Sequence, residues 1–267
     1  MKQPVPFKIP RLIAATFVRL CGFSFLPAFF WLCACLSLAA AERQAVSDGD
    51  IADSLAAMLR EARSVIASKQ ALIDDATLGD KSLDGKTVLA ETLARYRQVT
   101  GADPLAIDPA SRHGKLLRFE MDAIVQVMNQ NQAQINAKGT GFKGFIPSVF
   151  ARLVCDAFNQ SANGQAQMKV TAPSILIRNR RARPDAWEAG IIATKFLASD
   201  WPAGKPFSAV VEDQGRAAYR MLVPEYYDKS CLACHGLPKG QRDITGFPME
   251  GGVEGQLGGV ISVSLYR

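Results

Sequence analysis

Histidine is scarce in this chain: among 267 residues only His113 and His235 occur. A catalytic zinc site usually takes three protein ligands, most often histidines, so two histidines argue against a metallohydrolase. The sequence also lacks a glycine-rich phosphate loop and a Ser-His-Asp arrangement of the kind that supports acyl transfer. We therefore expect no enzymatic activity.

Excess positive charge is also absent from most of the chain. The 31 basic and 25 acidic residues give a net charge of +6, but residues 1–41 hold four of the basic residues and no acid. Without this segment 27 basic and 25 acidic residues remain, a net charge of +2. The pI near 9.1 therefore describes the N-terminus and is no evidence for nucleic-acid binding.

Residues 1–41 have the order of an export signal. A basic stretch is followed by uncharged, apolar sequence from Leu20, with small residues at Ala39 and Ala41 as in a signal cleavage site. Two alternatives stay open. An uncleaved membrane anchor needs about 20 apolar residues, and Cys35 in "LCAC" could instead be acylated. We expect an exported, periplasmic protein that is membrane-bound only if this segment is retained.

The remaining chain is also poor in cysteine, with Cys155, Cys231 and Cys234. The last two form "CLACH" with His235. A thioredoxin-type dithiol would start a helix after a strand, but the flanking sequences read as loops. Structural zinc needs four ligands, and no second cysteine pair follows. The motif is typical of one covalent c-type haem, with thioether bonds to both cysteines and His235 on the iron.

The position of the motif excludes a small electron-carrier cytochrome, in which it lies near the N-terminus. Here most of the chain precedes it, and the sequence ends in "GGVISVSLYR". Ile261, Val263 and Leu265 alternate with Ser262 and Ser264, which predicts a half-buried strand with the serines facing solvent.

Other segments predict helices followed by an antiparallel sheet, an α+β fold. Residues 207–221 read as a hairpin with its turn at 213–215, and residues 166–177 as an edge strand interrupted at Pro173. We expect four or five strands. Apolar residues at three-to-four spacing predict helices over 47–75, 86–99, 112–136 and 147–160.

The helical half contains an internal similarity. Residues 65–83 and 127–145 align without gaps at an offset of 62 positions and share Val, Gln, Ala, Ile, Gly and Lys. A duplicated helix-loop-helix explains this pattern, and a common loop chemistry between amphipathic helices is the alternative.

Three segments resemble a known family. "GFKGFIPSVFARLVCDAF", "RNRRARPDAWE" and "CLACHG", in this order and before a glycine-rich stretch, are similar to the Tll-type c-haem domains. The resemblance covers residues 115–267. It departs from the family where Asn179 is followed by Arg180 instead of proline, so the turn can differ.

The resemblance implies helices packed on a PAS-like antiparallel sheet that carries a covalent haem, as in the sensory regions of bacterial kinases and cyclases. We expect a signal segment at 1–41, a helical region at 42–111 and the PAS-like haem domain at 112–267. No output module follows the last strand, so we expect a sensing or binding module whose signal passes to a separate protein. A periplasmic electron-transfer cytochrome with a redox partner is the alternative.

The resemblance also implies a distal iron ligand, because some members use a cysteine on the helix before the "RN" motif, where Cys155 stands. At helical spacing Cys155 lies away from the apolar stripe centred on Phe150 and Val154, which favours a separate contact surface. The alternatives are His113, Met249, Met221 or an open site. Arg178 and Arg180 are candidate partners of the haem propionates, with a solvated basic loop as the alternative. Tyr226 and Tyr227 are candidates to flank the haem, and Trp187 is expected to be a packing residue.

Overall fold

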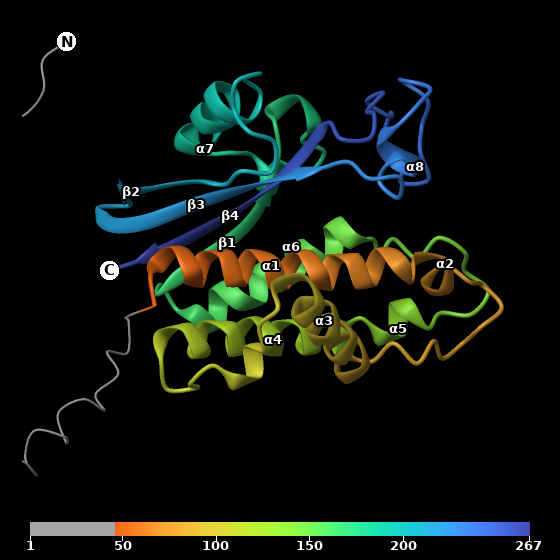
Figure 1. Cartoon of the computed structure of the whole chain (residues 1–267). Helices are drawn as coiled ribbons and strands as arrows, with labels where there is room; N and C mark the ends of the chain where they lie inside the picture. Colours follow the sequence, from red (N-terminus) through yellow and green to blue (C-terminus); the bar gives the residue numbers. More distant parts are fainter. Residues whose placement is uncertain (1–45) are drawn as a thin grey trace, which may run out of the picture. The chain divides into compact units, whose positions relative to one another are not determined.

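The computed structural model describes residues 46–267, so the expected signal at 1–41 lies outside the described residues. The described residues form one unit, in which helices cover one face of a four-stranded sheet (Figure 1). None of the helices in this range has the length and apolar character needed to cross a bilayer.

The four predicted helical segments are confirmed, although two of them are broken near their ends at Lys69 and Asn131. The helices are α1 (Asp48–Ser68), α2 (Gln70–Ile73), α3 (Gly85–Thr100), α4 (Arg112–Gln130), α5 (Gln132–Ile135) and α6 (Pro147–Ala162), with a 3-10 turn η1 (Pro104–Ala106). Side chains fix the starts of the helices, because Ser47, Asp84 and Ser111 accept hydrogen bonds from the first turns of α1, α3 and α4.

The helices form two copies of one arrangement at the offset seen in the sequence. The end of α4 and both ends of α5 and α6 lie 62 positions after the matching ends of α1, α2 and α3. Both α3 and α6 end at a residue with left-handed backbone, Gly101 and Asn163, again 62 apart. Helix α1 packs on α3 and α6, and α4 packs on α6 and α3, so each copy lies against the other.

The loops of the two copies exchange equivalent hydrogen bonds. Gln70 donates to the carbonyl of Phe145, and Gln132 donates to the carbonyl of Leu83. The backbone N–H of Lys81 donates to the side chain of Asn136, and that of Lys143 donates to Asp74. Within each loop the lysine ammonium is buried and donates to backbone carbonyls, of Leu78 and Gly79 in one copy and of Thr140 and Gly141 in the other.

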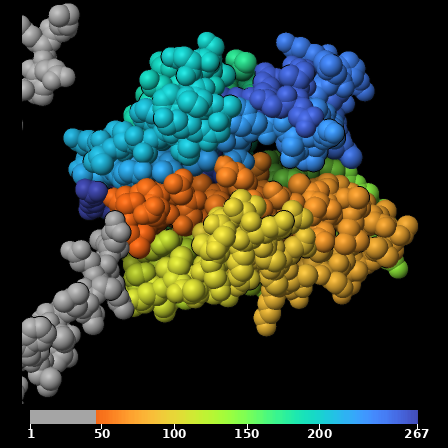
Figure 2. Space-filling model, viewed as in Figure 1, coloured from red at the N-terminus to blue at the C-terminus, as the bar shows by residue number. Residues whose placement is uncertain are grey.

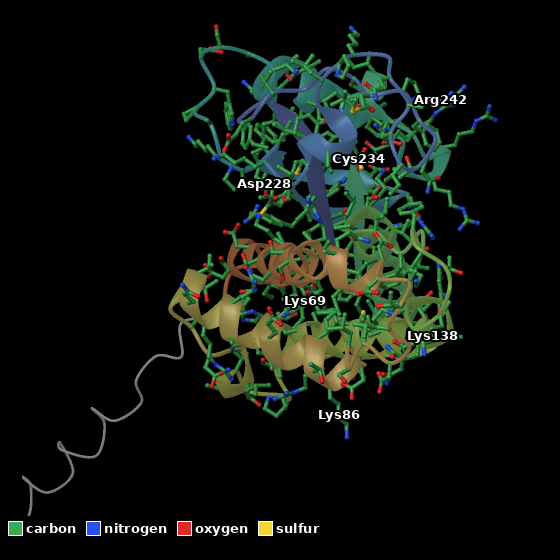
Figure 3. All side chains as sticks on the ribbon, turned by 90° about the vertical axis from the view of Figure 1, so that its right-hand side faces the viewer. Lys69, Lys86, Lys138, Asp228, Cys234 and Arg242 are labelled. Atoms are coloured by element: carbon green, nitrogen blue, oxygen red, sulfur yellow. The ribbon has the colours of Figure 1, made fainter. Side chains whose placement is uncertain are left out.

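Replacing Lys143 with methionine should lower the free energy of unfolding by about 2–4 kcal/mol. The backbone carbonyls that accept from its ammonium group would lose a charged donor and would stay buried. Lys138 projects into solvent in the same loop (Figure 3), so Lys138→Met should change it by less than about 0.5 kcal/mol. Urea denaturation followed by circular dichroism measures both. Equal stability of the two variants would show that the caged ammonium contributes nothing.

The sheet consists of β1 (Ala166–Thr171), β2 (Phe207–Asp213), β3 (Arg216–Tyr226) and β4 (Leu257–Tyr266), all antiparallel in the order β1-β4-β3-β2. The predicted hairpin is confirmed. Its two turn residues, Gln214 and Gly215, have φ values of 53° and 75°, as the tight turn of a twisted hairpin requires. Strand β1 lies at an edge and ends before Pro173, as predicted.

The inner face of the sheet carries the apolar side chains of its central strands. Ile261, Val263 and Leu265 are fully buried with Met168 and Met221 in the main core. Helices α1 and α6 cover this face, and α3 and α4 pack on the side of α1 and α6 that faces away from the sheet (Figure 1). The same core contains side chains from both sides of residue 112, where the haem domain was expected to begin.

The outer face of the sheet is covered as well, so the prediction that the serines of β4 face solvent is wrong. Ser262 and Ser264 are only 4% and 5% exposed. A segment containing η2 (Ser174–Leu176), η3 (Arg180–Ala182), α7 (Ala186–Ile191) and the π-helical turn η4 (Ile192–Phe196) lies over them (Figure 1). A two-residue alternation identifies the two faces of a strand but not what packs on the second one.

Candidate functional site

The "CLACH" motif lies in a lobe at one end of the sheet. Residues 227–256, here called the α8 lobe, connect β3 to β4 and contain one short helix, α8 (Leu232–His235). Figure 3 shows Cys234 and Asp228 together in this lobe, and in Figure 2 the lobe lies above the end of the helical layer.

Cys231 and Cys234 are free thiols that are partly exposed. A carboxylate positions the first of them: Asp228 Oδ1 accepts hydrogen bonds from the N–H groups of Ser230 and Cys231, at 2.7 and 3.2 Å. Partial burial raises the pKa of both thiols above the usual value. The two side chains are spaced on one helical turn and are unpaired, so both are available for covalent attachment.

The imidazole of His235 is held from two sides. Its Nδ1 lies 2.8 Å from Glu250 Oε2, and its ring stacks on Tyr227 with centroids 5.1 Å apart and an angle of 21°. An ionised carboxylate can only accept, so Nδ1 carries a proton, and in the neutral form of the ring Nε2 has the free lone pair. Nε2 has no hydrogen-bond partner among residues 46–267. The histidine is therefore oriented as metal-ligating histidines are, with one nitrogen fixed and the other free.

Arg178 joins the segments around this histidine. Its Nε donates to Glu250 Oε1 at 2.8 Å, its Nη1 to Asp243 Oδ2 at 2.6 Å, and its Nη2 to the Cys234 carbonyl at 2.8 Å. Burial alone would raise the pKa of Asp243, but hydrogen bonds from Thr245 and Arg178 lower it to about 2. In Glu250 the hydrogen bonds from Arg178 and His235 likewise outweigh burial and lower the pKa. Both carboxylates are thus charged at neutral pH.

Two glycines, Gly252 in the α8 lobe and Gly258 in β4, make room for Tyr227. A Cβ atom on Gly258 would lie 2.3 Å from the tyrosine ring, and one on Gly252 would lie 2.6 Å from it. The N–H of Gly252 also donates to the His235 carbonyl at 2.7 Å. The absence of a side chain at Gly252 and Gly258 therefore allows the backbone to approach the Tyr227 ring, which stacks on His235.

Cys155 lies on α6 in the main core and is 3% exposed. The separate contact surface expected for Cys155 is packed against protein, because α6 is covered by α1 and α4 on one side and by β1 on another. Its buried face is therefore wider than a single stripe and includes Ala151 and Phe158. Burial strongly raises the pKa of the Cys155 thiol, and the nearby Glu120 adds to this effect.

The guanidinium group of Arg63 affects the pKa of Cys155 and that of a thiol beside α8. The positive charge of Arg63 on α1 lowers the pKa of both Cys155 and Cys231, against the larger effect of burial at each. Arg63 and Arg60 also form ion pairs with Glu225, at 3.3 and 2.6 Å, where β3 leads into the lobe. The two thiols thus lie within electrostatic range of the same side chain.

The other expected site residues are placed as follows. Arg180 is exposed, and Arg178 has protein partners for all three guanidinium nitrogens, so propionate contacts by either stay a prediction. Tyr227 lies at the site, whereas the Tyr226 hydroxyl accepts from Gly204 on the other side of β3. Trp187 packs on Phe207, as expected of a packing residue.

The alternative distal ligands are scattered. His113 lies beside Asp50 near the start of α1, at the opposite end of that helix from Arg63. Met221 is in the main core and Met249 is buried in the α8 lobe. In residues 46–267 no three His, Cys, Asp or Glu side chains gather closely enough to hold a metal ion by themselves.

Two free thiols and a histidine with one free nitrogen, at the start of α8 and on it, fit the attachment of a haem, and together with the mixed fold they indicate a haem-binding domain. The chain belongs to the Tll0287-like family (Tll0287), a family of haem-binding domains, whose model matches residues 49–265. No curated protein and no solved structure matches the chain.

Sequence reasoning missed the carboxylates around His235. Asp243 and Glu250 follow the motif in a loop without periodicity, and Arg178 precedes it by more than fifty residues. Only the glycines near Glu250 signalled that this loop passes close to another group.

Proposed function

We propose that the chain is an exported redox or gas sensing module that carries one covalent c-type haem. Cys231 and Cys234 would form the thioethers, and His235 would bind the iron through Nε2. The observation that carries this proposal is the hydrogen bond from His235 Nδ1 to Glu250, which leaves Nε2 free on the helix that carries Cys234 and begins after Cys231.

A bound haem would supply a redox-active iron. The chain's own residues would then set its properties. Glu250, itself held by Arg178, orients the imidazole and increases its donation to the metal, which favours the ferric state. Tyr227 fixes the plane of the ring.

Replacing Glu250 with glutamine should raise the reduction potential by about 60 mV, which corresponds to a tenfold shift of a one-electron equilibrium. The amide keeps the shape but removes the charge that strengthens the imidazole. Spectroelectrochemical titration of the purified holoprotein measures the shift. Glu254→Gln removes a carboxylate from the exposed part of the same loop and is the matched control. An equal potential in wild type and Glu250→Gln would argue against His235 as the axial ligand.

Sensing is supported by the surroundings of Cys155. We propose this thiolate as the distal ligand in the ferric state, as the resemblance implies. Burial favours the protonated thiol, and Arg63 only partly opposes it, so the thiolate depends on the iron for its stability. A bound haem would supply an iron that a redox partner can reduce, and Cys155 would then take up a proton and release the metal, because burial favours the protonated thiol. Helix α6 would change its contacts, as in PAS-like sensors, and a separate signalling protein would respond.

Electron transfer is the second candidate, and the surface of the α8 lobe is the observation that favours it. Leu237, Ile244, Phe247 and Val253 are large apolar side chains of this lobe, and between 45% and 70% of each is exposed. Exposed apolar side chains beside a haem-attachment motif suit transient docking of a redox partner.

A further inference from the structure

A cavity of about 190 Å³ lies on the outer face of the sheet, away from the α8 lobe. Its floor consists of side chains on β1, β3 and β4, and its walls come from the start of α7 and from the β2–β3 turn. The lining includes Lys169, Arg220, Ser262 and Ser264 on the floor and Asp185 and Asp213 on the walls. This is the face on which the serines were expected to meet solvent and are instead covered.

Arg220 is a deeply buried charge in this cavity, with only 6% of its side chain exposed, and it lies beside Glu188, whose side chain is 1% exposed. Its Nη2 lies 2.6 Å from Asp185 Oδ2 and 3.3 Å from Glu188 Oε1, and its guanidinium lies 4.5 Å from the centre of the Trp187 ring. Its Nε is buried and has no hydrogen-bond partner among the described residues. An unpaired buried N–H is costly, so the cavity offers a donor without an acceptor.

The hydroxyl groups of Ser262 and Ser264 add to this donor set. Both residues are almost completely buried. Ser264 lies close enough to the Tyr266 hydroxyl to lower its pKa, against the larger effect of burial, and the Ser262 hydroxyl has no hydrogen-bond partner among the described residues. The two serines stand next to each other on the outer face of β4, and Ser264 lies opposite Arg220 in the register of β3 and β4. Three donors therefore converge on one side of the cavity.

The charged side chains that line the cavity include one more carboxylate than cations. Lys169 pairs with Glu188 at 2.6 Å, and Arg220 pairs with Asp185, so these four charges balance. Asp213 has no cationic partner among the described residues, and only the Tyr266 hydroxyl donates to it, at 2.7 Å. A simple anion would satisfy the donors but face this extra carboxylate. A simple cation would satisfy Asp213 but leave Arg220 Nε unpaired.

We propose that this cavity binds a small zwitterion, namely an α-amino acid. Its carboxylate accepts from Arg220 Nε and the serine hydroxyls, and its ammonium group faces Asp213. The volume of about 190 Å³ is sufficient for an amino acid as small as L-alanine or L-serine. The site is separate from the haem motif and does not depend on the proposed function.

Isothermal titration of the purified full-length holoprotein with L-alanine and L-serine tests the proposal. We expect saturable binding of at least one of them. Propionate and ethylamine, which each carry one of the two charges of L-alanine, should bind at least tenfold more weakly. The proposal is overturned if neither amino acid binds, or if either singly charged compound binds as tightly.

Two variants locate the site. Asp213→Asn removes the unpaired carboxylate from the end of a hairpin strand, and Ser262→Val removes a donor from the floor. Each should weaken amino-acid binding at least tenfold, whereas Ser208→Val, an exposed position of the same sheet outside the cavity, should leave it unchanged. Because Ser262→Val can disturb the buried face, its melting temperature is measured first, and Asp213→Asn decides if it does not fold. Unchanged affinity in Asp213→Asn would rule out the cavity as the binding site.

Discussion

Replacing Cys231 and Cys234 together with serine should abolish covalent haem attachment completely. The wild-type chain, produced with the cytochrome c maturation machinery, should gain the mass of one haem and keep it in denaturant. The double variant should gain none, because a hydroxyl does not replace the thiol in thioether formation. Intact-mass spectrometry and the pyridine haemochrome spectrum measure this all-or-none difference.

Two controls make this result specific. Cys155→Ser removes the remaining thiol of the described residues and should keep the full haem mass. Each single variant, Cys231→Ser or Cys234→Ser, should show an altered haemochrome band because one thioether remains. Haem mass retained by the double variant, or missing from the wild type, would contradict the assignment of the motif.

The second large effect is expected at Cys155. Cys155→Ser should remove the low-spin thiolate signal from the paramagnetic resonance and optical spectra of the ferric protein, since a buried hydroxyl is a far weaker ligand. His113→Gln and Met249→Leu, at the alternative positions, should leave these spectra unchanged. A low-spin signal that persists in Cys155→Ser would assign the ligand elsewhere.

The same residue separates the two candidate functions in the wild-type protein. If reduction releases Cys155, the ferrous protein should bind carbon monoxide, and backbone amides of α6 should exchange hydrogen faster than in the ferric protein. An electron carrier would keep both ligands in both states to minimise reorganisation. Equal protection of α6 and no carbon monoxide binding would therefore favour electron transfer.

Most of the fold was predictable from local patterns in the sequence. The hairpin turn at Gln214 and Gly215, the alternation of β4 and the helical spacing each depend on neighbouring residues, and they were predictable. The attachment motif was recognisable for the same reason. The contacts of Glu250 with His235 and Arg178 and the burial of Cys155 were not predictable, because they depend on segments that lie far apart in the chain. The burial of the serines of β4 was not predictable either, because the sequence of a strand does not reveal which other element packs on its second face.

The exchanged loop contacts of the two helical copies have a consequence for folding. Each copy supplies groups that complete the loop of the other, as Asn136 does for Lys81 and Asp74 does for Lys143. When one loop opens, the partners of the other are lost at the same time, so local opening of one copy is coupled to that of its counterpart. The duplicated helices therefore constitute a single foldon. A cut in the connection between α3 and α4 would separate two halves that are each incomplete, rather than two independent modules.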